Sequence, residues 1–532
     1  MIIGKTGGIL GAMIKMTLEF IKNNNSELLK LSTLGFLSGL SAAILIIAFR
    51  YLVESSQIAL LPGNDPENYE GLSPLATFLF PLTGGILIGA IFHFLPPAAR
   101  LTGLIYTIDS IRNNKGHLPF VNTVVQFLGA AISIVAGHSV GREGPSVHLG
   151  ASSGGLVAHL FNTPEQTKRI LLSCGVAAAI AASFNTPIAG VIFALEVIML
   201  EYAAISTIPI IIASSTATIL SHAVFGHDVA LDAPHLGDAS NLELIGMLIN
   251  GIAIGLIAVA FIRLLVSITQ KSKPYPIFWR LTLAGAITGV LALGAPEIMS
   301  IGYDTLSATF AGEIALYTLL IILVLKLLAT TIGLGLGLPG GLIGPTLVIG
   351  ALTGSVVGIV IQQIYPEMAG SPGLYAMIGM GAMMGATLQA PLAALIAIFE
   401  LTMNPNIILP GLIAIVAASL TCSELLKQPS VIFSLMRAKE IDQDEARLTK
   451  ELRSMPIDGI MTPIEKEDLK KLRRRQKNKI PHDATMADAV SAFRKTQQNQ
   501  LYVYDNNNTN KTMLGIISKD ALSDFIKQFS ND

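Results

Sequence analysis

The turn GREGP (141–145) lies between two long apolar runs and is followed by a helix-like segment, 146–157. A charged side chain at a bilayer centre costs about 3 kcal/mol, so intramembrane carboxylates usually face protein or water and mark an ion pathway. The turn recurs about 200 residues later as GLIGP (341–345), with Ile343 in place of Glu143. This recurrence favours an ion-pathway role for Glu143 over the alternatives, a surface loop or a simple helix cap.

Both turns have the composition of an anion-binding helix start. Glycine lets backbone amides approach a ligand, and proline suits the first helical position. The free amides and the positive end of the helix dipole then point at whatever lies before the helix. Two such helix starts that converge at mid-membrane would coordinate a dehydrated anion without a buried lysine or arginine.

The composition predicts a polytopic membrane protein, because 52% of the 532 residues are hydrophobic and only 13% are charged. The net charge of −1 and the lack of a basic surface give no indication of nucleic-acid binding. Cys174 and Cys422 lie in apolar segments without metal-ligand spacing and are interpreted as small core residues. We expect no metal and no cofactor. Without a nucleophile elbow or P-loop, the pattern does not indicate an enzyme.

The first part of the chain predicts a lead helix and two membrane spans. Residues 1–30 combine lysines with apolar residues, which favours a cytoplasmic amphipathic helix over a signal peptide. Segments 31–53 and 75–95 are long enough to cross a bilayer. The acidic loop between them is predicted to be external, as is 227–243, because positive charge concentrates on the cytoplasmic side. We expect a multi-pass protein of a bacterial inner membrane with both termini in the cytoplasm.

The chain also carries an internal repeat. Residues 175–199 align without a gap with residues 379–403, and both copies contain a matching glycine, proline and glutamate. The predicted halves are 31–224 and 239–440. The pattern of residues alone leaves open whether the halves are parallel or inverted.

Three apolar stretches are expected to be too short or too interrupted for simple spans: 120–136, 146–160 and 345–361. Interrupted segments at matching positions of two halves indicate a transport site.

Two motifs carry a family resemblance. GHSVGREGP (137–145) resembles the signature of the CLC chloride channels and proton/chloride antiporters, and GLPGGLIGP (337–345) resembles that family's second anion-binding loop. FNTPIAG (184–190) adds to the resemblance, which covers roughly residues 30–440. It implies an all-α polytopic membrane fold with two inverted-repeat halves and broken helices. It also implies chloride as the transported ion, contact with membrane lipid, and a homodimer with one complete pathway in each subunit.

The resemblance assigns Glu143 as the external gate, whose carboxylate competes with an anion for one site and retreats when protonated. It places the anion path along backbone amides of both turns and at the loop LTGL (101–104). Thr102 keeps a hydroxyl donor in that loop, although the family's first glycine and its proline are missing. The implied anion-binding residues are Thr102, Arg142, Glu143, Gly144, Leu342, Ile343, Gly344 and Ile432.

Two positions depart from the family pattern. The run PSVIFS (429–434) lacks the tyrosine whose hydroxyl touches the central anion, and Ile432 is its counterpart. The inner glutamate that passes protons toward the gate is replaced by Val197, while the adjacent Glu196 is repeated by Glu400. Glu196 is therefore interpreted as architectural, with a proton role as the alternative. We expect a channel-like chloride pathway; the alternatives are a proton/chloride antiporter and fluoride or nitrate transport.

The remainder of the chain predicts a separate small α/β tail. Residues 441–480 are charge-dense and predict a linker, with attraction to anionic lipid as the alternative. Residues 481–532 resemble a single CBS motif with a leading strand near 457–461 and a capped helix start at 483–490. In that motif an adenine nucleotide meets an aspartate three residues after a serine or threonine, whereas Asp520 follows Ser518 by two. We expect pairing across a dimer rather than nucleotide binding.

Overall fold

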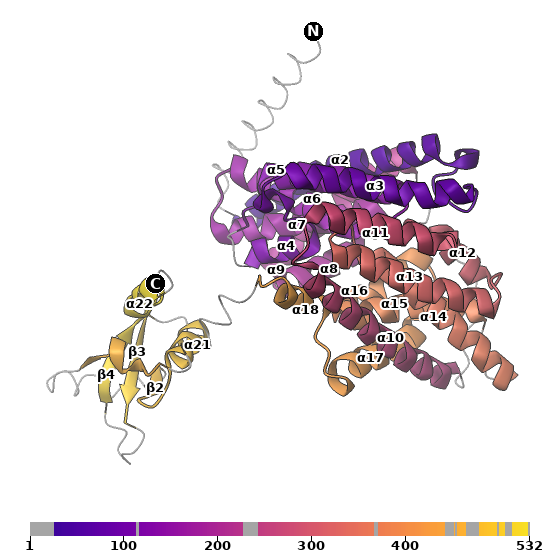
Figure 1. The fold of residues 1–532 in the computed structure, drawn as a ribbon. Helices are drawn as coiled ribbons and strands as arrows, with labels where there is room; N and C mark the ends of the chain where they lie inside the picture. The colour runs from indigo at the N-terminus through magenta and orange to yellow at the C-terminus, as the bar shows by residue number, and fades with distance from the viewer. Residues whose placement is uncertain are drawn as a thin grey trace, which may run out of the picture. The chain divides into compact units, whose positions relative to one another are not determined.

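The computed structural model describes residues 26–112, 116–226, 243–366, 371–441, 452, 455–463, 478–496, 499–505 and 513–529. The chain divides into two compact units, Met1–Lys439 and Glu440–Asp532. In Figure 1 the first unit is a bundle of packed helices and the second a small sheet with helices. The predictions for residues 1–25, for the loop 227–242 and for most of the charged linker lie outside the described residues.

The first half of the helical unit begins with a helix longer than the predicted span. Residues 27–30, assigned from the sequence to the lead helix, form the first turn of this helix, and Ser26 caps it. The helices of this half are α2 (Glu27–Leu60), α3 (Pro74–Phe94), α4 (Gly103–Arg112), α5 (Phe120–Val135), α6 (Glu143–Leu160), α7 (Glu165–Phe184), α8 (Pro187–Phe193), which continues into the π-helix Ala194–Met199, and α9 (Ala204–Phe225).

The second half repeats this order of long and broken helices. Its helices are α10 (Glu243–Ser272), α11 (Ile277–Ala292), α12 (Tyr303–Ala311), α13 (Leu316–Leu336), α14 (Ile343–Ile364), α15 (Pro372–Leu388), α16 (Pro391–Thr402), α17 (Ile408–Leu420), which continues into the π-helix Thr421–Leu425, and α18 (Val431–Ala438).

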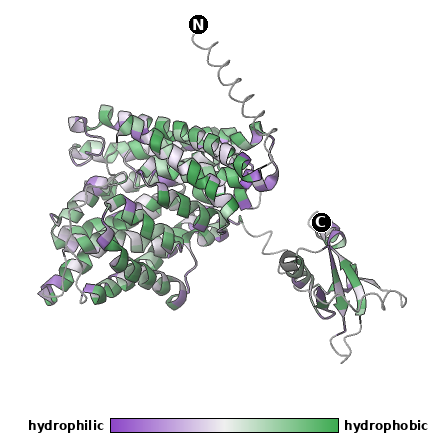
Figure 2. Cartoon of the chain, turned by 180° about the vertical axis from the view of Figure 1, so that it is seen from behind, coloured by the Kyte–Doolittle hydropathy of each residue, from purple (hydrophilic) through white to green (hydrophobic). Residues whose placement is uncertain are grey.

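Among the described residues, eight helices are long and apolar enough to cross a membrane, and Figure 2 shows hydrophobic residues along the helices of this unit. The fold is therefore the predicted all-α polytopic membrane fold. One expectation is wrong: the stretch 345–361 belongs to α14, which has 22 residues and is one of the eight. This helix begins two residues before Pro345. The proline is tolerated there because a proline in the first turn of a helix removes no helical hydrogen bond. In contrast, α5 has 16 residues and falls among the shorter apolar helices.

Matching helices in the two halves pack through matching glycines. A Cβ on Gly150 of α6 would collide with the carbonyl oxygen of Gly175 in α7, and a Cβ on Gly350 of α14 with that of Gly379 in α15. Small residues at such contacts let membrane helices approach backbone to backbone. The repeat seen in the sequence is thus a repeat of helix contacts.

The two halves also exchange carboxylates reciprocally. Glu196 accepts hydrogen bonds from the N-terminal amides of α16, at 2.7 Å from Ala393 N and 3.3 Å from Leu392 N. Glu400 accepts bonds from the start of α8, at 2.7 Å from Ala189 N and 2.9 Å from the preceding amide. Each glutamate therefore caps a helix of the opposite half, where the helix dipole favours negative charge. This reciprocal pattern is what a two-fold relation between the halves would produce, and it supports the architectural interpretation of Glu196.

The second unit contains a four-stranded sheet with the strand order β1-β4-β3-β2. Its strands are β1 (Thr462–Pro463), β2 (Lys479–Pro481), β3 (Gln500–Tyr504) and β4 (Met513–Ser518), and its helices are α21 (Met486–Thr496) and α22 (Lys519–Phe529). The β2–β3 pair is parallel, whereas β3–β4 and β1–β4 are antiparallel.

Two expectations for this tail need correction. The leading strand falls at 462–463, because residues 457–460 form a 3-10 helix. Strand β2 begins at Lys479, within the range assigned to the linker. Helix α21 starts at Met486, inside the predicted range 483–490, and Thr485 caps it: Asp488 N donates to Thr485 Oγ1, and Thr485 N donates to the Asp488 carboxylate. The positions of β3, β4 and α22 are as predicted.

The reciprocal caps generate a stability prediction. Glu196→Ala and Glu400→Ala should each lower the apparent melting temperature in detergent, because a hydrogen bond to a charged group contributes about 2 kcal/mol. Glu424→Ala is the matched control, because within the described part of the chain its exposed carboxylate pairs with the exposed Lys427. This substitution should change the melting temperature little. Two unchanged melting temperatures would contradict the capping role. A loss confined to transport in Glu196→Ala would instead favour a proton role.

Candidate functional site

The two glycine-proline turns pair with each other through their backbones. Gly141 N donates to Gly341 O at 2.8 Å, and Gly341 N donates to Gly141 O at 2.7 Å, which forms an isolated antiparallel bridge. Glycine is required here, because a Cβ on Gly341 would lie 2.6 Å from Gly144 N. The bridge brings together segments that are about 200 residues apart in the sequence.

The bridge sets the N-termini of α6 and α14 next to each other. Glu143 is the first residue of α6 and Ile343 is the first residue of α14. The first four amides of a helix have no partner within it, and the positive end of the dipole lies there. Two converging helix starts therefore form a site for negative charge.

The Glu143 carboxylate occupies the space between these two turns. Glu143 is buried, with 3% of its surface exposed. A Cβ built on Gly344 would lie 2.7 Å from its Oε1, and one on Gly341 would lie 2.9 Å from its Oε2. Neither oxygen has a hydrogen-bond partner of acceptable geometry among the described residues. The carboxylate is thus held by the field of the two helix ends rather than by a side-chain partner.

A small cavity of about 40 Å³ lies beside this carboxylate. It provides space next to the gate that is mostly apolar. Its lining residues are Glu143, Ile180, Phe184, Thr186, Ala189, Phe193, Ile343, Leu347, Met384, Ala397 and Leu401.

The structure gathers most of the residues predicted for the anion path, but not all. Arg142, Gly144, Leu342, Ile343 and Gly344 belong to the paired turns around the carboxylate.

Thr102 and Ile432 do not line the described cavity that contains the carboxylate. They lie at the starts of α4 and α18, two helices that contact each other. Asn122 of α5 holds the loop before Thr102 by donating to Leu101 O at 2.8 Å. The two residues therefore lie on contacting helices, outside that cavity.

Val197 lies in the π-helix that follows α8 and is buried, with 4% of its surface exposed. Its carbonyl oxygen accepts a hydrogen bond from Arg112 Nη2 at 3.0 Å. The Arg112 guanidinium also lies 5.9 Å from the centroid of the Phe433 ring. A valine beside a fixed cation therefore stands where the resemblance expects an acid.

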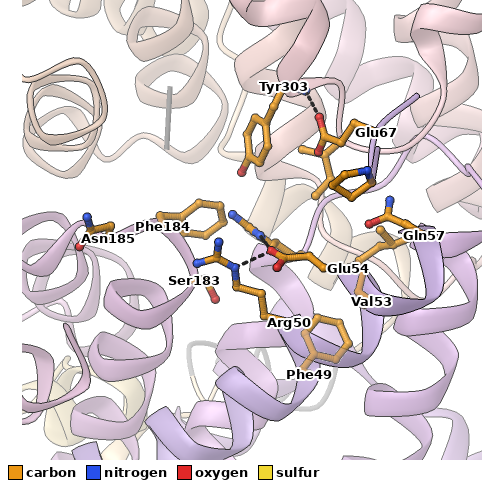
Figure 3. Close-up of a pocket in the computed structure, with 14 residues that line it drawn as sticks. Phe49, Arg50, Val53, Glu54, Gln57, Glu67, Ser183, Phe184, Asn185 and Tyr303 are labelled. Atoms are coloured by element: carbon orange, nitrogen blue, oxygen red, sulfur yellow. Dashed lines mark hydrogen bonds and ion pairs between the residues drawn. The ribbon is translucent and has the colours of Figure 1, made fainter. Parts of the chain in front are cut away.

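A larger cavity of about 230 Å³ was not predicted from the sequence (Figure 3). Arg50 and Glu54 of α2 form an ion pair at 2.5 Å in its wall. Arg142, the residue after Gly141, also lines this cavity. The signal was present, because Arg50 lies inside the predicted span 31–53 and an ionisable residue in a span indicates function.

The comparisons with known proteins agree with these features. The family model described as Voltage gated chloride channel matches residues 84–423. A putative chloride channel protein ClcB-like from Ralstonia nicotianae is 30% identical over 397 residues, covering 72% of this chain and 92% of that protein. The H(+)/Cl(−) exchange transporter ClcA from Vibrio cholerae is 31% identical over 318 residues, covering 57% of this chain and 67% of that protein.

A solved structure of a slow cyanobacterial Cl−/H+ antiporter superposes with a TM-score of 0.67 at 24% identity, covering 77% of this chain and 97% of that one. This likeness concerns the fold. The family match covers more than half of the sequence and includes both paired turns. The chain therefore belongs to the CLC family.

Proposed function

We propose that this protein moves chloride across a membrane along a pathway that Glu143 gates. The observation that carries the proposal is the position of the Glu143 carboxylate between two converging helix N-termini. A carboxylate there carries the charge of the anion that these helix ends would bind. The names of the relatives, a putative chloride channel and a chloride exchanger, favour chloride as the ion.

The gate would work by exchange of one negative charge for another. An ionised Glu143 blocks the site, because an anion would need the same space and the same field. Protonation removes the charge that holds the carboxyl between the helix ends. The neutral side chain can then leave for the mostly apolar cavity beside it, which costs less than moving a charge there.

The rest of the path would depend on backbone amides rather than on cationic side chains. The proposed anion ligands are the amides near Arg142, Glu143 and Gly144 and those of Leu342, Ile343 and Gly344. Thr102 would add a hydroxyl farther along, whereas the side chain of Ile432 has no hydrogen-bond donor. We therefore propose a central site that holds the anion weakly.

We further propose that the pathway is channel-like. An antiporter needs an ionisable relay between the cytoplasm and the gate, and Val197 cannot carry a proton. Arg112, hydrogen-bonded to the Val197 carbonyl, adds positive charge where a proton would have to pass. A proton/chloride antiporter is the second candidate, supported by the printed function of the ClcA relative. Fluoride or nitrate transport remains an alternative because the Thr102 loop departs from the family pattern.

The assembly we propose is a homodimer embedded in lipid, with one pathway in each subunit. The short helices α8 and α16 pack on each other within the subunit, yet Ile188 and Leu392 are each about half exposed on them. Exposed apolar side chains on membrane helices face lipid or a partner, and small residues around them suit close helix packing.

For the C-terminal unit we propose a CBS-like role in pairing rather than in nucleotide binding. The Ser518 hydroxyl accepts a hydrogen bond from Ala521 N at 3.1 Å and so caps α22. A hydroxyl used as a helix cap is engaged at the position where the motif would meet a nucleotide.

The gate predicts a dependence of chloride flux on external pH. Flux into liposomes should rise as external pH falls, since protonation frees the blocked site. Glu143→Gln should remove most of this rise and conduct at every pH. A pH profile in Glu143→Gln that matches the unmodified protein would exclude Glu143 as the gate.

The missing relay predicts uncoupled transport. A chloride gradient imposed on liposomes should drive chloride without uphill proton movement, followed with a pH-sensitive dye. Val197→Glu alone should not fully restore proton pumping, because the tyrosine at the position of Ile432 is also absent. Uphill proton movement by the unmodified protein, abolished by Glu143→Gln, would replace the channel proposal with the antiporter.

The dimer predicts a mass in detergent of twice the chain mass of 56.2 kDa. Light scattering that separates protein from detergent would measure it. A single-chain mass across a range of mild detergents and in lipid nanodiscs would contradict the proposed assembly.

A further inference from the structure

The cavity of about 230 Å³ next to the GREGP turn is large enough for a hydrated ion. About 10–15 Å³ of such space is enough to hold one water, so the cavity has room for several waters. Figure 3 shows side chains of α2, of the 61–73 loop and of the α7 C-terminus directed into it. The residues that matter here are Arg50, Glu54, Glu67, Arg142, Phe184 and Tyr303.

Two guanidinium groups are fixed in this cavity by aromatic rings. Arg142 lies 5.0 Å from the ring centroid of Phe184 and 5.3 Å from that of Tyr303. Arg50 lies 3.9 Å from the ring centroid of Phe225. Contacts of this kind hold the face of a guanidinium and leave its N–H edge for other partners.

These donors are incompletely satisfied. Within the described ranges, Arg142 Nε and the Tyr303 hydroxyl are buried without a hydrogen-bond partner of acceptable geometry. The ion pair of Arg142 with Glu54 is long, at 3.8 Å from Nη1. Buried polar atoms normally have partners, so this arrangement calls for water or a ligand.

The charges of the cavity balance only while both of its carboxylates are ionised. Arg50 and Arg142 supply two positive charges, and Glu54 and Glu67 supply two negative charges. Protonation of Glu67 would leave one net positive charge. The Glu54 carboxylate lies 2.5 Å from Arg50 Nε.

Glu67 lies in the loop between α2 and α3, outside the membrane spans. Burial, together with the negative charge of Asp304, raises the pKa of Glu67 to about 7, against the opposing effects of Arg142 and of the two amides that Glu67 accepts. Its carboxylate accepts hydrogen bonds from Tyr303 N at 3.0 Å and from Asp304 N at 3.3 Å. The other charged or titratable groups around it are Tyr69 and Glu70 of its own loop and Lys326 of α13.

We propose that this cavity is a second anion-binding site, which holds a small inorganic anion between Arg50 and Arg142 and binds it more tightly when Glu67 is protonated. The proposal rests on the anion pathway proposed above. Arg142 directly precedes the gate Glu143, and Phe184 lines both this cavity and the small one beside the gate. The site would deliver an anion to the pathway from the side of the 61–73 loop, which is predicted to be external.

The test separates this site from the gate by working in the Glu143→Gln background. The measured quantity is the external chloride concentration that gives half-maximal flux, at pH 6 and at pH 8. Glu67 gains its proton between these values as the pH falls, so the half-saturating concentration should be about fivefold lower at pH 6, the effect of one partly screened charge. The maximal rate should change little.

Two variants and one control locate the effect. Glu67→Gln keeps an acceptor for the two amides and should hold the half-saturating concentration at its low value at both pH values. Arg50→Gln removes a cation and should raise it at both. Glu70→Gln is the matched control, because burial and Asp304 also raise its pKa to about 7 but Glu70 does not line the described cavity. It should retain the pH shift.

Chloride titration calorimetry of the purified full chain, run in parallel at both pH values, keeps the test independent of transport. One outcome is that the protein shows no flux but binds chloride with a pH dependence that Glu67→Gln abolishes. That outcome would overturn the transport proposal and support the site. The other outcome is that flux is present but its half-saturating chloride concentration does not change with pH, or changes equally in Glu67→Gln. That outcome would overturn the second site and leave the transport proposal intact.

Discussion

The two backbone hydrogen bonds between Gly141 and Gly341 are the interaction on which the rest of the site depends. They fix the N-termini of α6 and α14 against each other, so two helix dipoles act on one small volume. The Glu143 carboxylate fills that volume. Any larger residue in these turns would separate the helix ends, and the field that favours an anion would weaken. The glycines are therefore needed both for packing and for charge.

The same two-fold relation extends outward from the paired turns. Glycine contacts join α6 to α7 and α14 to α15, and Glu196 and Glu400 each cap a helix of the opposite half. These carboxylates reach the helix starts through charge-assisted hydrogen bonds, which hold the halves in one relative position. The positions of the paired turns thus depend on contacts well outside them.

The sequence allowed the membrane fold, the repeat and the paired turns to be predicted, because each leaves a local pattern. Apolar runs indicate the membrane fold, a gapless internal match indicates the repeat, and glycine-proline motifs indicate the turns. It did not allow the length of α14 or the start of β1 to be predicted, since helix ends depend on where backbone amides find partners. The cavity lined by Arg50 and Arg142 was also not predicted from the sequence. Those side chains come from α2 and from the start of α6, and no pattern in the sequence brings the two together.

The central claim is that an anion and the Glu143 carboxylate compete for one place between the paired turns. Anomalous diffraction from crystals of the Glu143→Gln protein grown in bromide tests it most directly. The account predicts a bromide peak beside Gly341 and Gly344, where the carboxylate oxygens lie in the unmodified chain, and a weaker or absent peak there when Glu143 is present. Equal bromide peaks in both proteins, or no peak at that place in either, would contradict it.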